Sequence, residues 1–455
     1  MYVVLLCEGV FSMFRNLAII VFSLILSFFQ PTFGQEYRDI HQEKLDNGVS
    51  VIFIDANSSD MLLVMFCVSC GSTDEVEKEG VANLLSKIYA KKLNDNGNNL
   101  HYGAEINSYV GYDQSMYYVL AKTENLDGIL KNFGQIYSDF SVSKEEINTQ
   151  KQDVEQSLLS KSQIDKNIIH RESMRSLYWH SKYGSDIEGT FDSLKKISED
   201  DIKRFKERNY ANNRVTIIIS GNLKKNNAME LVKKYFSGGK KTSSEIVRMQ
   251  EPSHHESTIA LTRYSNQISV PMVELYWRIP NYRQEKDNAL STEIFINAMS
   301  DILQKELIHV QKRVASISIS YSSWNYDYGD LCITFTVPDS EKTSDIITAV
   351  LTEIKNIACD GITKQQAEIA VQKIVDSCKF VGHDMFDVVD RLSRRIGSGY
   401  DFDFLVRYPK FAREYDLNKI NAQAKRIFRN DPSVIATIMP VRNTKNAKSD
   451  RNNNQ

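Results

Sequence analysis

The alternation of apolar and polar positions predicts short strands and amphipathic helices in an order that runs through the chain twice. Residues 79–93 show the helical spacing most clearly, because their apolar positions recur at i, i+3, i+4, i+7 and i+8. That stripe consists of Val81, Leu84, Leu85, Ile88 and Tyr89. The other helices expected in this half cover residues 125–140, 144–161, 166–178, 201–210 and 226–236. Strands are expected at 43–55, 61–72, 106–123 and 214–223, and an Asp-Asn-Gly turn opens the first of them.

The second half repeats this order of elements. Strands are expected at residues 268–280, 315–324, 330–338 and 432–440. Helices are expected at 287–307, 344–358, 363–380 and 416–428. Two halves of similar size with the same element order indicate an internal duplication and two related α/β domains.

Length and local composition set the expected boundaries. A chain of 455 residues is too long for one compact core. A polar stretch with paired glycines reads as a linker. We therefore expect a signal peptide at 1–34, a first domain at 38–238, a linker at 239–256, a second domain at 257–441 and a disordered tail at 442–455.

The N-terminus has the order of a secretory signal. Arg15 precedes an apolar run from Leu17 to Phe29, and small residues follow, with cleavage expected near Gly34. Met13 begins a better signal than Met1 and is the expected true start. An uncleaved membrane anchor is the alternative, although the run is short for a span of about 20 residues. Cleavage and export place the protein outside the cytoplasm, most simply in a bacterial periplasm.

Charge and cysteine content exclude several classes of function. The formal net charge of −2 lacks the basic excess that nucleic-acid binding requires. The six cysteines are too scattered for a disulfide framework. Cys67 and Cys70 form a CxxC, but they lie in a segment that reads as a buried strand, where positions three apart point to opposite faces. We therefore expect neither a redox motif nor a zinc knuckle there.

Four stretches of the first half, in order, resemble the insulinase-like (M16, pitrilysin) metallopeptidase family. They are "KLDNGVSVIFI", "GSTDEVEKEGVANLL" with Gly71, Ser72, Asp74, Glu75, Gly80 and Ala82, "INSYVGYDQSMYY" with Asn107, Asp113 and Tyr117 or Tyr118, and residues 178–223. In the second half the match is clearest at "ILQKELIHVQKRVASISIS". The resemblance implies a fold of α/β class (α+β type), in which two homologous domains each have a mostly antiparallel sheet packed against helices.

The resemblance also places a zinc motif on the helix at 79–93, and this chain departs from it. Active members carry His-x-x-Glu-His there, which supplies two imidazole ligands and a general base. The matching positions are Asn83, Ser86 and Lys87. A neutral amide is a poor partner for zinc beside imidazole, a hydroxyl does not titrate near neutral pH, and an ammonium repels the metal.

The family also has a distant carboxylate ligand, and two alignments of its position stay open here. The matching helix places Ser157 at the ligand and Gln150 at an assisting Glu, and a slip of two or three residues would instead offer Glu155. The eight histidines include no pair at i, i+3 or i+4, so they suggest no rebuilt site. No metal is expected in this chain, and zinc is expected in a partner subunit.

The family resemblance implies a two-chain chamber in which the zinc-free chain grips substrate through an Arg and a Tyr seven positions apart. Those positions are Ile308 and Ala315 here, so this grip is missing too. Arg313 and Tyr321 are weak substitutes. Lys87 is a third weak candidate, for peptide carbonyls or a partner carboxylate.

These observations favour a catalytically inactive M16-like subunit that pairs with a zinc-bearing homologue and holds extended peptide by strand addition at a sheet edge. Two alternatives stay open. One is an active zinc metalloendopeptidase with an unrecognised site, and the other is a homodimeric peptide-binding protein. Neither nucleic acid nor a stable membrane span after signal cleavage is expected.

Overall fold

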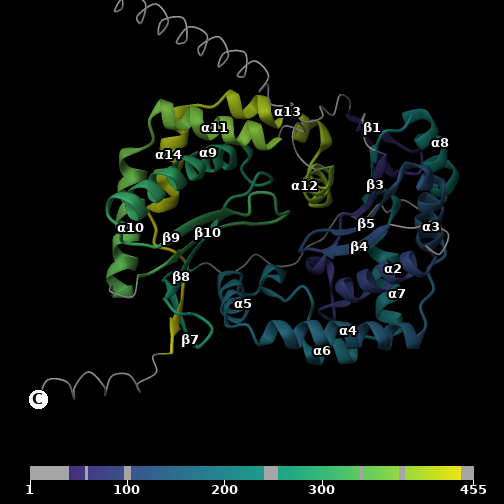
Figure 1. The fold of residues 1–455 in the computed structure, drawn as a ribbon, viewed down its shortest axis with the longest axis horizontal. Coiled ribbons are helices and arrows are strands. Elements are labelled where there is room, and N and C mark those ends of the chain that lie inside the picture. The colour runs from purple at the N-terminus through teal and green to yellow at the C-terminus, as the bar shows by residue number, and fades with distance from the viewer. Residues whose placement is uncertain are drawn as a thin grey trace, which may run out of the picture.

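A computed structural model describes two β-sheets, one from each half of the chain, each packed against helices (Figure 1). The described residues are 40–56, 60–96, 104–239, 255–338, 342–378 and 385–441. In this part of the chain, no helix is both long enough and apolar enough to cross a bilayer. The expected signal peptide, nearly all of the expected linker and the expected tail lie outside the described residues.

The first sheet has the strand order β1-β2-β6-β3-β5-β4. Only β2 and β6 run parallel, and every other neighbouring pair is antiparallel. Both central strands, β3 and β6, are buried along nearly their whole length, which explains their continuous apolar runs. The strands are β1 (Ile40–Lys44), β2 (Ser50–Asp55), β3 (Met61–Val68), β4 (Glu105–Val110), β5 (Ser115–Lys122) and β6 (Val215–Gly221).

The second sheet repeats this topology with the order β7-β11-β8-β10-β9. Its single parallel pair, β7 with β11, corresponds to β2 with β6, and the remaining pairs are antiparallel. The expectation of two homologous α/β domains with mostly antiparallel sheets is therefore confirmed. The strands are β7 (Ile259–Ser265), β8 (Met272–Ile279), β9 (Ser316–Tyr321), β10 (Gly329–Thr336) and β11 (Val434–Pro440).

Each domain has its own apolar core on one face of its sheet. The expected stripe of the helix at 79–93 is buried as predicted and packs into the first core. The first half contributes α2 (Val81–Asn96), α3 (Leu126–Ser138), α4 (Lys144–Ser162), α5 (Asp165–Leu177), α6 (Phe191–Lys196), α7 (Glu199–Asn209) and α8 (Lys225–Phe236). The second half contributes α9 (Lys286–Leu303), the π-helical segment η6 (Gln304–Val310), α10 (Thr343–Asp360), α11 (Lys364–Cys378), α12 (Met385–Gly397), α13 (Phe402–Arg413) and α14 (Leu417–Phe428).

Each half of the chain packs one helix against the sheet of the other half. Helix α12 of the second half packs on the other face of the first sheet, where Val388, Val389 and Leu392 meet Met65 and Ile218. Helix α5 of the first half packs in the same way on the second sheet (Figure 1). Each half therefore completes the burial of the other half's sheet, and this ties the two domains together.

The structure corrects several element predictions. The single strand expected at 106–123 is a hairpin, because β4 and β5 are joined by a tight turn in which the Gly111 N–H donates to the Gln114 carbonyl at 2.9 Å. Apart from short 3-10 turns, five elements were not expected as separate elements, namely β1, β7, α6, α12 and α13. Strand β7 lies at a sheet edge, where half-buried and exposed positions alternate and only its last residue is fully buried, so it has no strong apolar run. Helix α12, which was also not predicted, has its apolar face buried by the other domain.

Candidate functional site

The candidate site lies at the first turns of α2, and a buried carboxylate holds that end of the helix. The Gly80 N–H donates to Glu75 Oε2 at 3.0 Å, and the Ala82 N–H donates to Oε1 at 2.8 Å. These are among the N–H groups that a helix cannot satisfy internally. Burial raises the pKa of Glu75 to about 8, although both hydrogen bonds favour its charged form.

Gly80 is required at this turn by its backbone conformation. Its φ of +91° lies in the left-handed region, and a Cβ there would stand 2.7 Å from the Glu188 carbonyl oxygen. The segment around Glu188 therefore passes directly against the start of α2.

The three positions that match the zinc motif lie together on α2, in an environment unlike a metal site. Asn83 is only 6 % exposed and Ser86 only 1 %, so two of the three are buried. Neither Asn83 Nδ2 nor Ser86 Oγ has a hydrogen-bond partner within the described residues, although the Tyr117 hydroxyl is near Ser86. Lys87 is half-buried, and in the described structure its ammonium forms neither an ion pair nor a hydrogen bond.

Strand β4 presents a third buried polar atom without a partner. Ser108 Oγ is buried and unbonded among the described residues. Ser108 is opposite Tyr117 in the β4–β5 ladder, so it lies on the same face of the sheet as that tyrosine and as α2. Burying hydroxyl and amide groups without hydrogen-bond partners costs free energy. The stability of the packed core therefore does not explain why Asn83, Ser86 and Ser108 are polar.

The two candidate positions for the distant carboxylate ligand, Ser157 and Glu155, have different neighbours in the structure. The Ser157 hydroxyl lies 3.3 Å from Glu188 Oε1, beside the segment that packs on the start of α2. Glu155 instead lies on the side of Lys151, which points toward α6. Gln150 is buried, and its Nε2 donates to Asp153 within the same helix at 3.2 Å.

Glu188 is a site residue that sequence reasoning missed. Its carboxylate accepts hydrogen bonds from Ser157 and from the Lys161 ammonium, the latter at 2.7 Å. The Glu188 carboxylate, from the loop before α6, thus lies next to Ser157, but it forms an ion pair with the Lys161 ammonium. The only sequence signal was its place directly before Gly189, which does not distinguish it from a surface residue.

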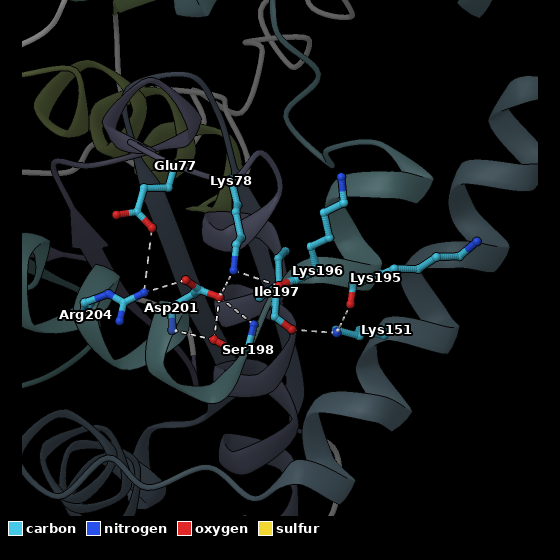
Figure 2. A network of polar contacts seen from close by, with 9 residues as sticks. All are labelled: Glu77, Lys78, Lys151, Lys195, Lys196, Ile197, Ser198, Asp201 and Arg204. Carbon is cyan, nitrogen blue, oxygen red and sulfur yellow. Dashed lines mark hydrogen bonds and ion pairs between the residues drawn. The ribbon is translucent and has the colours of Figure 1, made fainter.

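Two lysines cap the last carbonyls of α6, namely Lys78 from the segment that leads into α2 and Lys151 from α4 (Figure 2). The Lys78 ammonium donates to the Lys196 carbonyl at 2.8 Å. The Lys151 ammonium donates to the carbonyls of Lys195 and Ile197 at 3.2 and 2.7 Å. Cations at a helix C-terminus are favoured both by the orphan carbonyls and by the helix dipole.

Asp201 is the anionic centre of the same network (Figure 2). It receives Lys78 at 2.6 Å, the Ser198 N–H at 2.7 Å and Arg204 at 2.7 Å. Burial raises the pKa of Asp201, but the hydrogen bonds from Lys78 and Ser198 outweigh it and lower the pKa to about 2. The charges of Lys78, Lys151 and Asp201 are therefore all used in structural contacts.

No metal site forms in the described part of the chain. No three His, Cys, Asp or Glu side chains among the described residues are grouped so that they could hold an ion. Cys67 and Cys70 lie in different cores on opposite sides of the first sheet, as expected, and burial raises the pKa of Cys67 to about 12. His170 bonds the Tyr276 hydroxyl at 2.9 Å, and His101, His254 and His383 lie outside the described residues.

The second-half candidates are not brought together. Arg313 is exposed and precedes β9, whereas Tyr321 is the last residue of that strand, which by itself spans about 17 Å. The Tyr321 hydroxyl donates to the Pro280 carbonyl, so its polar group is already used. Ile308 and Ala315, which the resemblance aligns with the missing grip, have no functional side-chain group.

Comparison with protein-family models finds two matches in series. Residues 50–190 match the family described as insulinase, peptidase family M16, and residues 196–374 match the peptidase M16 inactive domain.

Individual relatives are distant. The chain is 18% identical to the uncharacterized zinc protease YmxG of Bacillus subtilis, over 87% of this chain and 97% of that protein. It is 23% identical to mitochondrial cytochrome b-c1 complex subunit 1 of Bos taurus, over 46% of this chain and 45% of that protein, so it matches about half the length of that relative.

Solved structures share the fold at low identity. A protease from Helicobacter pylori superposes with a TM-score of 0.76 at 16% identity, covering 88% of this chain and 100% of the other. The periplasmic protease PqqL from Escherichia coli superposes with a TM-score of 0.74 at 17% identity, covering 91% of this chain and 48% of PqqL.

Proposed function

Because the chain belongs to the insulinase-like M16 family of peptidases, we propose that it is a non-catalytic member that holds extended peptides and pairs with a zinc-bearing homologue. The partner would supply the metal, the general base and bond cleavage. This chain would supply one half of the peptide chamber.

The observation that carries the proposal is the chemistry of α2. An amide, a hydroxyl and an ammonium stand at the three positions of the motif, and the alignment that we propose places Ser157 at the fourth. These residues do not fit zinc, because they offer neither imidazole nor carboxylate and one of them is a cation. The carboxylate nearest to Ser157, that of Glu188, is held by Lys161.

Peptide holding is proposed at the free edge of β4. This strand bonds only β5 within the described sheet. Since Gly111 and Gln114 form a hydrogen-bonded pair, alternation along the ladder turns the backbone N–H and C=O groups of Ile106, Ser108 and Val110 toward the open edge. The Asn107 side chain already accepts from the Ser108 N–H at 2.8 Å, as expected of a donor without a strand partner. An extended peptide can add here through main-chain bonds.

Lys87 is the residue of α2 best suited to contact such a peptide. Its ammonium is unpaired in the described structure, and the polar atoms of Asn83 and Ser86 beside it lack partners. A peptide carbonyl or a partner carboxylate would satisfy it. This role binds substrate without activating water, in agreement with a non-catalytic chain.

We also propose export to the periplasm of a bacterium, with domains at 38–238 and 257–441. Arg15 and the apolar run from Leu17 to Phe29 support a cleaved signal. The structural relative PqqL is itself a periplasmic protease, which supports the same compartment for this chain.

The test is metal content and peptide handling of the purified chain. We expect less than stoichiometric zinc by elemental analysis, no cleavage of a casein-derived peptide mixture, and capture of peptides that is weakened by Ser108→Pro but not by Ser108→Ala. Proline removes the outward N–H while leaving the β4–β5 bonds intact. Chelator-sensitive cleavage by the pure chain would refute the proposal. Light scattering of the chain alone and with a zinc-bearing homologue separates the heterodimer from a homodimeric peptide-binding protein.

A further inference from the structure

We propose that helix α12 forms a side-chain subsite at the β4 edge, in which Arg394 selects peptides that carry an acidic side chain opposite Tyr109. The inference rests on the proposed function, since it requires a peptide strand beside β4. In this proposal, Arg394 from the second half of the chain determines which peptide side chain is preferred at β4, an edge strand of the first half.

One face of β4 is turned toward α12. Tyr118 is opposite Asn107 in the β4–β5 ladder, and its ring packs edge-on against Phe386 of α12 at 4.8 Å between centroids. Met116 is opposite Tyr109 and belongs to the apolar cluster beneath α12. Because opposed residues share a face, Glu105, Asn107 and Tyr109 point to the α12 side. All three are exposed.

Arg394 reaches from α12 to this face. Its guanidinium lies over the Tyr109 ring with 4.1 Å between the central carbon and the ring centroid. Its Nε donates to Asp390 Oδ2 at 2.8 Å, which fixes the plane of the group. The side chain of Arg394 remains 40 % exposed. Asp390 and the Tyr109 side chain thus hold the guanidinium in place, which preorganises it, and its exposed part remains accessible to a ligand.

An added strand brings one of its side chains beside this guanidinium. The Tyr109 backbone bonds β5, so an antiparallel strand on the free edge would oppose Tyr109 in a non-hydrogen-bonded pair, where side chains approach closely. The opposed Cβ atoms would be about 4.5–5.5 Å apart on the α12 face. A Glu or Asp at that position can reach the outer N–H groups of Arg394.

The surrounding charges determine at which end of β4 an acidic peptide side chain is preferred. Asp390 offsets part of the Arg394 charge, and Glu105 lies at the far end of the same face, where it accepts from the Tyr118 hydroxyl at 2.6 Å. Arg391 of α12 is turned away and donates to the Ser377 carbonyl of α11. The positive end of the β4 face is thus at Tyr109 and Arg394, and the negative end is at Glu105.

The test uses nine-residue synthetic peptides with the full chain. A peptide array screened with fluorescently labelled protein selects a binder, and anisotropy then compares its Glu-bearing form with the Glu→Gln form. We expect the Glu peptide to bind wild type about two- to fivefold more tightly, as for a partly exposed charge pair. This preference should shrink at high salt and vanish in Arg394→Gln. The matched control Arg391→Gln, which removes the same charge from the same helix, should retain it.

The outcomes distinguish this subsite from the binding edge itself. Peptides that bind in a manner sensitive to Ser108→Pro, yet show no Glu-over-Gln preference, would overturn the subsite and leave the binding edge intact. The same result follows if Arg394→Gln keeps the full preference. A chain that captures no peptide, or that captures peptides equally well with Ser108→Pro, would overturn both.

Discussion

The buried carboxylate of Asp113 provides a sharp test of how the two halves are joined. It is fully buried in the turn between β4 and β5. The Tyr183 hydroxyl donates to its two oxygens at 2.7 and 2.8 Å, and the Tyr326 N–H of the second half donates at 2.8 Å. The Asp327 N–H in turn donates to the Tyr183 hydroxyl at 3.0 Å. We perturb this network with Asp113→Ala, Tyr183→Phe and the double variant.

The magnitudes follow from the bonds that each substitution removes. A hydrogen bond to a charged group contributes about 1.5–3 kcal/mol, and a buried donor left without a partner costs about 1–3 kcal/mol. Asp113→Ala removes the acceptor used by the Tyr183 hydroxyl and by the Tyr326 N–H, so we expect a loss of about 3–5 kcal/mol in the free energy of unfolding. Tyr183→Phe should cost about 2 kcal/mol. Because Tyr183 has less to lose once Asp113 is absent, the double variant should fall short of the sum by about 1.5 kcal/mol.

The assay is urea unfolding followed by circular dichroism and by tryptophan fluorescence. Two of the three tryptophans, Trp277 and Trp324, lie in the second half, so fluorescence reports mainly on that domain. In wild type the two signals should change together, and in Asp113→Ala they should separate as the halves uncouple. Asp60→Ala, which truncates an exposed carboxylate, is the control. Additive single effects, or an Asp113→Ala variant as stable as Asp60→Ala, would refute the reasoning.

Four further expectations concern the candidate site. Burial raises the pKa of Glu75 from 4.5 to about 8. The stability that this group contributes is therefore fully present below pH 4.5 and is lost as pH rises toward 8. We expect urea midpoints measured from about pH 5 to 8 to fall less steeply in Glu75→Gln than in wild type. Lys78→Ala breaks the ion pair with Asp201, and we expect the free energy of unfolding, measured in urea at pH 7, to fall by about 1 kcal/mol. An unchanged free energy of unfolding would show that the ion pair does not stabilise the fold. Gly80→Ala should cost about 1–3 kcal/mol in the same assay, because a Cβ would meet the Glu188 carbonyl at a positive φ. Dialysis against a chelator should leave the melting temperature unchanged, and a drop that zinc restores would contradict the metal-free interpretation.

Much of the candidate site was accessible from the sequence, because it depends on the type of residue at fixed helical spacing. Asn83, Ser86 and Lys87 lie on one helix, so their chemistry could be judged without tertiary information. Glu188 could not be found in this way, since it reaches Ser157 from a loop 31 residues later in the chain. The depth of burial of Asn83 and Ser86 was also hidden, because it depends on packing from elements beyond α2.

The sequence by itself determined the two related α/β halves, the buried stripe of α2 and the absence of zinc-ligand chemistry on that helix. These follow from local periodicity and from the functional groups of single residues, which tertiary contacts do not change. Only the tertiary structure decided that α12 and α5 cross between the halves, that Asp113 ties both halves together, and that Arg394 lies against Tyr109 at the β4 edge. Those contacts join segments hundreds of residues apart, and a periodic pattern specifies which face of an element is buried but not which partner covers it.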